Sequence, residues 1–374
     1  MQGRVVRMAP KDTRPRWNGT ASFRYPRLPM CAQTARALPP LAIGILAALL
    51  AGCANEPLRR ASPRAASTHD AVSSPTRKSI WHEKTKETIT LRFADEEFAV
   101  VHFAAKPKPF LYPFYAPGGV PITRAWPQEE REGEAHDHPH HTSVWFAHGD
   151  VNGADFWHPQ AKNGGVIEYT GRLNELLSRG KRLRTRHTYT WKGPQGEELL
   201  HERRTLLFGA EHDQRWVDTK FELTALKDEV VFGDTKEGTF AIRLHPALRL
   251  KGEVATGTIL NAVGDKDAKA WGERAAWVHY GGTVDEQEVG VAIFEHPDNF
   301  RHPTWWHARD YGLLAANPFG TRAFEGGKAE SGRFVLKQGE TLVLRYRIWT
   351  HTGKRTLEEL AAAFKVYVIQ SEEM

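Results

Sequence analysis

The sequence predicts an all-β protein, a large antiparallel β-sandwich with a C-terminal helix. From residue 80 onwards, short runs rich in β-branched and aromatic residues recur between turns that contain glycine or proline. In residues 217–223, apolar and polar side chains roughly alternate, as they do in a strand that is buried on one face. Helical patterns do not alternate with these segments, so we expect two packed antiparallel sheets.

The strand-like segments follow one another along most of the chain. Residues 88–93 and 97–103 are expected to form a hairpin across Ala94-Asp95-Glu96. The stretch 106–127 contains six prolines and two glycines and is expected to be an extended, loop-rich passage rather than a helix. Further strands are expected at 143–148, 165–169, 183–191, 199–208, 215–226, 229–232, 240–244, 276–280, 289–295 and 341–350.

One helix is predicted near the C-terminus. Thr356 is a favoured N-cap residue, and Glu358 and Glu359 in the first turn complement the helix dipole. The apolar run 360–364 then continues the helical pattern. A short helical turn is also expected at residues 174–178.

The N-terminal segment resembles a bacterial export signal over residues 1–52. Its apolar run, 38–50, has signal-peptide length and is too short for a convincing membrane span. It ends in Leu50-Ala51-Gly52-Cys53, which resembles a lipoprotein signal with Cys53 as the lipidated residue. Residues 53–79 are expected to be a flexible tether, and residues 80–371 the folded domain. We therefore expect an exported protein, anchored by lipid to the bacterial cell envelope and facing the periplasm or the cell surface.

Removal of the signal changes the charge of the chain. The whole sequence has 51 Lys and Arg, 45 Asp and Glu, and a formal net charge of +6. Residues 1–52 hold eight of the basic residues and one acid, which leaves 43 basic and 44 acidic residues. This balance argues against nucleic-acid binding, which needs a basic surface. The only cysteines, Cys31 and Cys53, leave the folded part without a disulfide or thiol ligand.

The first candidate site is Asp137-His138-Pro139-His140-His141. Pro139 favours an extended His138, and alternation would then place His138 and His140 on one strand face, with Asp137 and His141 on the other. His138 and His140 could bind a divalent metal, with Asp137 or His141 orienting them. Alternatively, the histidines could act in acid–base chemistry or substrate binding. Other His-Pro pairs, at 158 and 302, are expected to satisfy loop carbonyls.

Two further constellations carry polar residues. Asp234-Thr235-Lys236-Glu237 lies between apolar strands; it is either part of a site or an exposed charged turn. Asp234 and Glu237 are catalytic candidates, together with His138 and His140. Tryptophans accompany Asn, Arg and His in the C-terminal third, a mixture that suits a carbohydrate cleft, although many of the rings belong in a core. Expected substrate contacts are Arg124, Asp137, His141, Asp155, Lys236, His296, Trp305 and Asn317.

Several motifs follow one order that resembles a known bacterial family. They are Pro117-Gly118-Gly119, the Asp-His-Pro-His-His block at 137–141, Asp155-Phe156-Trp157, Gly233-Asp234-Thr235-Lys236-Glu237-Gly238 and Asn317-Pro318. The family is of unknown function and is labelled methane oxygenase PmoA-like. The resemblance implies a large β-sandwich, similar to the mutarotase-like supersandwich that binds sugars. Such enzymes place a His acid and a carboxylate base around the sugar, which here implies His138 or His140 with Glu237 or Asp234.

The leading prediction is an exported lipoprotein that acts on or binds carbohydrate through a His/Asp/Glu cleft, by hydrolase, lyase or epimerase chemistry. The alternatives are a metal-dependent oxygenase or hydrolase and a non-catalytic surface glycan-binding protein. Expected partners are a small molecule or glycan and, through the lipid anchor alone, the membrane. All three hypotheses require that imidazoles near residue 140 and carboxylates near residue 235 face one hollow.

Overall fold

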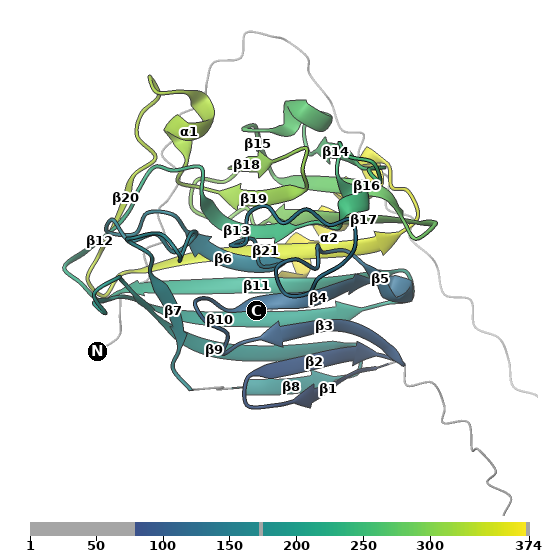
Figure 1. Ribbon diagram of the computed structural model, residues 1–374, viewed down its shortest axis with the longest axis horizontal. Coiled ribbons are helices and arrows are strands. Elements are labelled where there is room, and N and C mark those ends of the chain that lie inside the picture. The colour runs from purple at the N-terminus through teal and green to yellow at the C-terminus, as the bar shows by residue number, and fades with distance from the viewer. Residues whose placement is uncertain (1–78, 172–174, 372–374) are drawn as a thin grey trace, which may run out of the picture. The chain divides into compact units, whose positions relative to one another are not determined.

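The computed structural model describes residues 79–171 and 175–371 of the chain. The predicted export signal, Cys53 and, apart from Ser79, the predicted tether lie outside the described residues. Two large antiparallel sheets and a C-terminal helix dominate the folded part (Figure 1), which confirms the predicted all-β class. In the described part of the chain, no helix combines the length and apolar character that crossing a bilayer requires.

The first sheet has ten strands. They are β1 (Ile80–Lys84), β2 (Thr88–Phe93), β3 (Glu96–His102), β4 (Phe110–Ala116), β5 (Val120–Pro121), β6 (Val144–His148), β13 (Gly238–Arg243), β15 (Arg274–Ala275), β18 (Thr304–Ala308) and β19 (Leu313–Asn317). Their order is β1-β2-β3-β4-β6-β13-β19-β18-β15, and β5 pairs with β4. The centre of this sheet therefore joins chain segments that are about 70 to 100 residues apart in sequence.

The second sheet has nine strands. They are β7 (Val166–Tyr169), β8 (Glu175–Arg179), β9 (Arg182–Lys192), β10 (Glu198–Ala210), β11 (Gln214–Ala225), β14 (Thr258–Asn261), β16 (Trp277–Val284), β17 (Gln287–Glu295) and β21 (Thr341–Thr352). Their order is β14-β16-β17-β21-β11-β10-β9-β7, and β8 pairs with β9. A separate ribbon joins β12 (Glu229–Phe232) to β20 (Phe334–Lys337). Every predicted strand overlaps a strand of the structure.

The main core lies between the two large sheets. Phe146 of β6 stacks on Phe221 of β11 with ring centroids 3.9 Å apart, and Phe240 of β13 stacks on Tyr346 of β21 at 5.1 Å. Because successive residues of a strand point to opposite faces, the neighbours of Phe146 and Phe240 point away from this core. The outer face of the ten-stranded sheet is thus available for other groups.

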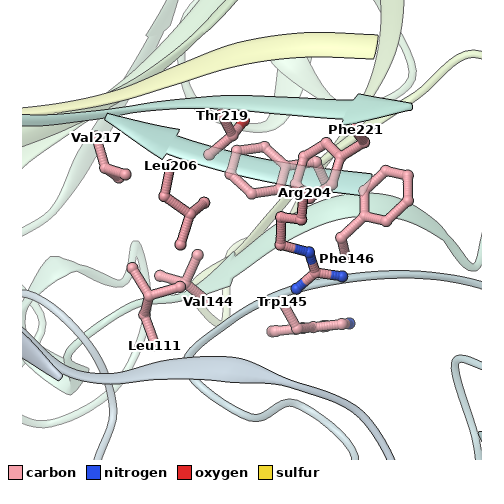
Figure 2. A pocket seen from close by; sticks show the side chains of 10 residues that line it. Leu111, Val144, Trp145, Phe146, Arg204, Leu206, Val217, Thr219 and Phe221 are labelled. Carbon is pink, nitrogen blue, oxygen red and sulfur yellow. The ribbon is translucent and has the colours of Figure 1, made fainter. Parts of the chain in front are cut away.

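One ion pair is buried within this core. Arg204 of β10 donates from Nε to Glu202 at 2.6 Å, and Glu202 also accepts from Trp191 Nε1 at 2.7 Å. Figure 2 shows the Arg204 guanidinium among the rings of Phe146 and Phe221, beside a void of about 10 Å³. Such a void has room for no more than about one water molecule. Glu202 is therefore the counter-ion on which the buried Arg204 depends.

The C-terminal helix α2 (Leu357–Ser371) covers part of the outer face of the nine-stranded sheet. Thr356 Oγ1 accepts from the Glu359 N–H at 3.2 Å, and Glu359 accepts from the Thr356 N–H at 2.8 Å. This reciprocal capping box confirms the predicted start of the helix. The buried contact is apolar and joins Leu360 and Tyr367 of α2 to Trp216, Trp277, Ala292, Phe294 and Trp349 of the sheet.

The stretch 106–127 contains strands β4 and β5 between loop segments, which agrees with the predicted extended, loop-rich passage. Pro113 lies where the pairing of β3 with β4 is irregular, so its missing N–H breaks no regular ladder. The helical turn predicted at residues 174–178 was wrong. The described residues of this stretch belong to strand β8 (Glu175–Arg179), which pairs with the long neighbouring strand β9. The other helical segments are short: η1 (Pro117–Gly119), η2 (Pro246–Leu248), η3 (Asp267–Ala270) and α1 (Thr321–Glu325).

Candidate active site

A polar cavity of about 320 Å³ brings the histidine cluster and the 235-region together. Its walls come from the turn before β6, the loop after β6, the segment before β13, and β18 with the turn that follows it. The lining side chains are His138, His140, His141, His158, Lys236, Glu237, His307, Arg309 and Tyr311. Imidazoles near residue 140 and one carboxylate near residue 235 therefore face the same hollow.

The cavity belongs to the outer face of the ten-stranded sheet. Trp145 pairs with Ala241, Ala241 with Ala315, and Ala315 with His307, so these four side chains share one face across four strands. Phe146, the residue after Trp145, points into the core between the sheets. Trp145 and the other side chains on its face, including His307, therefore point away from that core. Trp145 also stacks on His141, with ring centroids 5.1 Å apart. The sheet thus supports the histidine cluster from below.

The cluster at 138–141 is a turn, and the predicted extended conformation was wrong. The His141 N–H donates to the His138 carbonyl at 3.0 Å, and His138 has φ of 49°. Histidine is among the residues that adopt this left-handed region comparatively often. Because the chain turns, strand alternation does not apply, and His138, His140 and His141 all line the cavity.

Asp137 lies behind the cluster and holds it to two buried arginines. It accepts from Arg243 Nη2 at 2.8 and 3.0 Å, from Arg124, and from His138 Nδ1 at 2.6 Å. Burial acts to raise the pKa of Asp137, but Arg243, His138 and Arg124 outweigh it and lower the pKa to about 2. Arg124 also donates to the carbonyl of His138. Arg124 and Asp137, predicted substrate contacts, instead position the lining residues.

The partners of the histidines fix their tautomers. A carboxylate accepts hydrogen bonds, so His138 carries its proton on Nδ1 and leaves Nε2 as an acceptor when neutral. A guanidinium only donates, so His141 accepts from Arg243 at Nδ1, 3.0 Å away, and carries its proton on Nε2. Burial holds the pKa of His141 well below its ordinary value, so the ring stays neutral. The turn therefore offers both an acceptor and a donor.

His158 forms a second carboxylate–imidazole pair. Asp155 accepts from His158 Nδ1 at 3.0 Å and from the backbone N–H groups of Trp157 and His158 at 2.9 and 2.8 Å. Burial acts to raise the pKa of Asp155, but the bonds from His158 outweigh it and lower the pKa. The ionised carboxylate leaves Nε2 of neutral His158 as an acceptor. The expectation that His158 merely satisfies a loop carbonyl was wrong, and Asp155 orients it rather than lining the cavity.

Glu237 is the carboxylate of the lining. Burial raises its pKa, and the charges of His158 and Lys236 only partly oppose this effect. The segment that carries Glu237 is held by its backbone. The Gly149 N–H donates to the Glu237 carbonyl at 2.7 Å, and Asn317 Nδ2 donates to the Thr235 carbonyl at 2.8 Å. The 233–238 segment is thus a supported wall of the cavity and not an exposed charged turn.

His140 is central among the rings. Its centroid lies 4.1 Å from that of His158 and 4.4 Å from that of His141. Burial is the main cause that lowers its pKa, and with the charges of His158, Lys108 and His138 the pKa is about 3. Lys108 lies behind the lining, where burial lowers its pKa to about 7 and its ammonium donates to the Trp157 carbonyl at 3.0 Å. His140 is therefore neutral near pH 7.

Besides Arg124, Asp137 and Asp155, four further predicted site residues do not line the cavity. Asp234 accepts from the backbone N–H groups of Arg322 and Gly332, at 3.0 and 2.6 Å, and so fixes the segment that follows β19. Trp305 is buried and donates to Glu325 at 2.9 Å, away from the cavity lining. The other two make structural contacts with the backbone. Asn317 donates to the Thr235 carbonyl, and His296 accepts from the Asp298 N–H.

Some lining residues were missed from the sequence. His307 lies on β18, and Arg309 and Tyr311 lie in the turn between β18 and β19, a pair of strands that was not predicted. For His158 a signal exists, since Asp155 precedes it by three residues and can reach its ring. Within residues 79–171 and 175–371, no group of three or more His, Cys, Asp or Glu side chains is arranged to hold a metal ion. The predicted ligands His138 and His140 belong to no such group.

Residues 88–365 match the family of unknown function DUF6807. The chain belongs to this family. Nothing in this match bears on the predicted PmoA-like label, which stays a prediction. The curated proteins compared with the chain include no match.

Several solved structures are similar at low identity. A galactose mutarotase-like protein of Clostridium acetobutylicum is 12% identical with a TM-score of 0.38, over 74% of this chain and 100% of that one. A glycoside hydrolase family 97 enzyme variant of Pseudoalteromonas sp. strain K8 is 12% identical with a TM-score of 0.30, over 74% of this chain and 34% of that one. A putative aldose 1-epimerase of Escherichia coli K12 is 11% identical with a TM-score of 0.25, over 73% and 99%.

Proposed function

We propose that this DUF6807 member is an enzyme that moves protons on a small polyhydroxylated substrate of the carbohydrate class. One observation carries the proposal. His158, oriented by Asp155, and Glu237, with its raised pKa, line the same cavity. At about 320 Å³, the cavity lies at the lower end of the range of about 300–1,000 Å³ found for small-molecule sites.

The two groups offer complementary hydrogen-bonding roles. Neutral His158 has a free lone pair on Nε2 because Asp155 holds the proton on Nδ1, so it can accept a proton from substrate. Glu237 holds its proton to a higher pH than an ordinary carboxyl group and can donate it. Among the described residues, Glu237 is the single carboxylate in the lining. This favours epimerase or lyase chemistry over a glycosidase, which requires two carboxylates.

The recognition groups fit hydroxyls. His138 offers an acceptor nitrogen and His141 a donor, and a sugar hydroxyl can satisfy both because it donates and accepts. Tyr311 adds a phenolic group to the lining and stacks on His138 with centroids 5.1 Å apart. Trp305, the tryptophan predicted as a substrate contact, is not part of the lining, and Trp145 and Trp157 lie beneath His141. Polar contacts therefore dominate the proposed binding.

The experiment is a panel of aldoses, ketoses, uronates and glycosides incubated with the protein in D₂O and followed by NMR. Epimerisation or elimination at a carbon next to a carbonyl would exchange a C–H for C–D or release a new alkene. His158→Gln and Glu237→Gln are expected to lower the rate by about 10²–10⁴-fold. His212→Gln, at an exposed position, is the matched control. Ligand binding without any turnover would refute the enzyme proposal and favour a glycan-binding protein.

For location, we propose export with a lipid on Cys53. The support is the sequence Leu50-Ala51-Gly52-Cys53 after an apolar run. Expression in a bacterium fed radiolabelled palmitate should label the wild type and leave Cys53→Ala unlabelled. Label retained in the variant, or absent from both, would contradict the anchor.

A further inference from the structure

The cavity contains two cations whose charges the lining does not match. Arg309 forms no ion pair with a carboxylate among the described residues, although its guanidinium lies 5.4 Å from the ring centroid of Tyr311 and 6.0 Å from that of Trp271. Within the described part of the chain, the ion-pair partner of Lys236 is Glu237, 3.9 Å away, and the Lys236 side chain is 53% exposed. Half-buried arginines normally find an anionic partner, so this one has bonding capacity to spare.

The residues behind the lining do not supply the missing negative charge. Asp137 is already shared between Arg124 and Arg243, and Asp155 is bonded to His158 and to backbone N–H groups. Burial also raises the pKa of Glu237, which makes this carboxyl group a weaker counter-ion. The electrostatic potential inside the cavity is therefore positive, and such a cavity concentrates anionic ligands.

Arg309 and Lys236 line the cavity together with His307, and we call this part of the lining the cationic wall. Burial is the main cause that lowers the pKa of His307, and together with the charges of Arg309 and Lys236 it brings the pKa to about 3. His307 is neutral near pH 7 and adds no charge of its own. Among the described residues, Arg309 forms no ion pair with Glu237, whereas Lys236 Nζ lies 3.9 Å from Glu237 Oε1. Arg309 is therefore the cation that can be changed with less effect on the acid–base pair.

We propose that Arg309 and Lys236 form a subsite for an anionic group on the substrate, which makes the substrate of this site an acidic sugar. This inference rests on the carbohydrate class proposed above. A guanidinium binds a carboxylate or phosphate through two parallel hydrogen bonds, and its contacts with Tyr311 and Trp271 restrict its position before the ligand arrives. Lys236 adds a mobile point charge at the rim.

The test is isothermal titration calorimetry with matched sugars. Glucuronate and galacturonate are compared with glucose and galactose, and glucose 6-phosphate and glucose 6-sulfate identify the preferred anion. We expect at least one acidic sugar to bind about tenfold or more tightly than its neutral counterpart, with affinity that falls as salt rises. Arg309→Gln should remove this preference, Arg309→Lys should restore part of it, and Lys236→Met should reduce it. Exposed Arg333→Gln and Lys227→Met are the matched controls.

Two sets of results overturn the subsite. One is equal affinity for acidic and neutral sugars, or no binding of any anionic sugar. The other is an anion preference that Arg309→Gln leaves intact. Failure of the proposed function looks different: an acidic sugar that binds through Arg309 and is never converted supports the subsite and refutes the enzyme. Conversion of neutral sugars at a rate that Arg309→Gln does not change refutes the subsite and leaves the enzyme.

Discussion

Replacing Asp137 by Asn tests the charge network that holds the histidine turn. Asp137 is the shared counter-ion of Arg124 and Arg243, whose side chains are 3% and 1% exposed. The asparagine keeps the shape of the side chain and removes its charge. The two buried guanidiniums then face each other without an anion, and the Nδ1–H of His138 loses its ionised acceptor.

The magnitude follows from the pKa of Asp137. Its depression from 3.8 to about 2 is equivalent to roughly 2.4 kcal/mol, at about 1.36 kcal/mol per pH unit. The side chain is 37% exposed, so solvent screening reduces the value to about 1–2 kcal/mol. At about 2.1 cal/mol/K per residue, the roughly 290 described residues give an unfolding entropy near 0.6 kcal/mol/K, so Tm should fall by about 2–3 °C.

The dependence on pH has a definite sign. A carboxyl group whose folded pKa is depressed stabilises the fold above its unfolded pKa, and this contribution is lost as the pH falls towards the folded value. The stability gap between wild type and Asp137→Asn should therefore be complete at pH 7, narrow below about pH 5, and lose roughly half its size by pH 3. Urea unfolding followed by tryptophan fluorescence measures the gap, with exposed Asp95→Asn as the control. No loss of stability at pH 7, or a gap independent of pH, would refute the reasoning.

Three further predictions concern stability. Glu202→Ala should lower the free energy of unfolding in urea by about 3–5 kcal/mol, because Arg204 stays buried without its counter-ion. Adding Arg204→Met to this variant should recover part of the loss. A double variant whose loss equals the sum of the two single losses would contradict this prediction. Wild type should lose stability relative to Lys108→Met as the pH falls from about 10 towards 7. The pKa of Lys108 is lowered to about 7 in the folded protein, so over this range the unfolded chain binds the proton and the folded protein does not. Parallel pH profiles of stability for the two proteins would contradict this prediction. Thr356→Ala should cost about 1 kcal/mol while Thr356→Ser keeps the cap, and equal losses would argue against the capping box with Glu359.

The fold class was predictable because strand signals are local. Strands such as 217–223 have one face in the core and alternate in polarity, so their period is visible in the sequence. Strands β18 and β19 are buried along their whole length, and a continuous buried run has no period to detect. The sequence did not show where strands lie within 106–127, because the position of Pro113 at an irregularity of the β3–β4 pairing depends on the partner strand.

The site was predictable only in part. The density of imidazoles at 138–141 and the charged residues at 236–237 marked two walls of the cavity, since these motifs are contiguous in sequence. Their geometry came out differently, because the His141 N–H closes a turn that local backbone preference does not reveal. The cationic wall was missed for another reason. Arg309 enters the cavity from a turn between two strands that no sequence period marks.

One close backbone approach has a consequence for how the proposed acid could evolve. A Cβ atom added to Gly149 would lie 2.9 Å from Glu237 Cβ and 3.1 Å from the Glu237 carbonyl oxygen. Any larger residue at 149 would force the segment that carries Glu237 to shift and would displace its carboxyl group. One substitution at a position outside the cavity lining could therefore disable this carboxyl group while every polar residue of the lining keeps its identity.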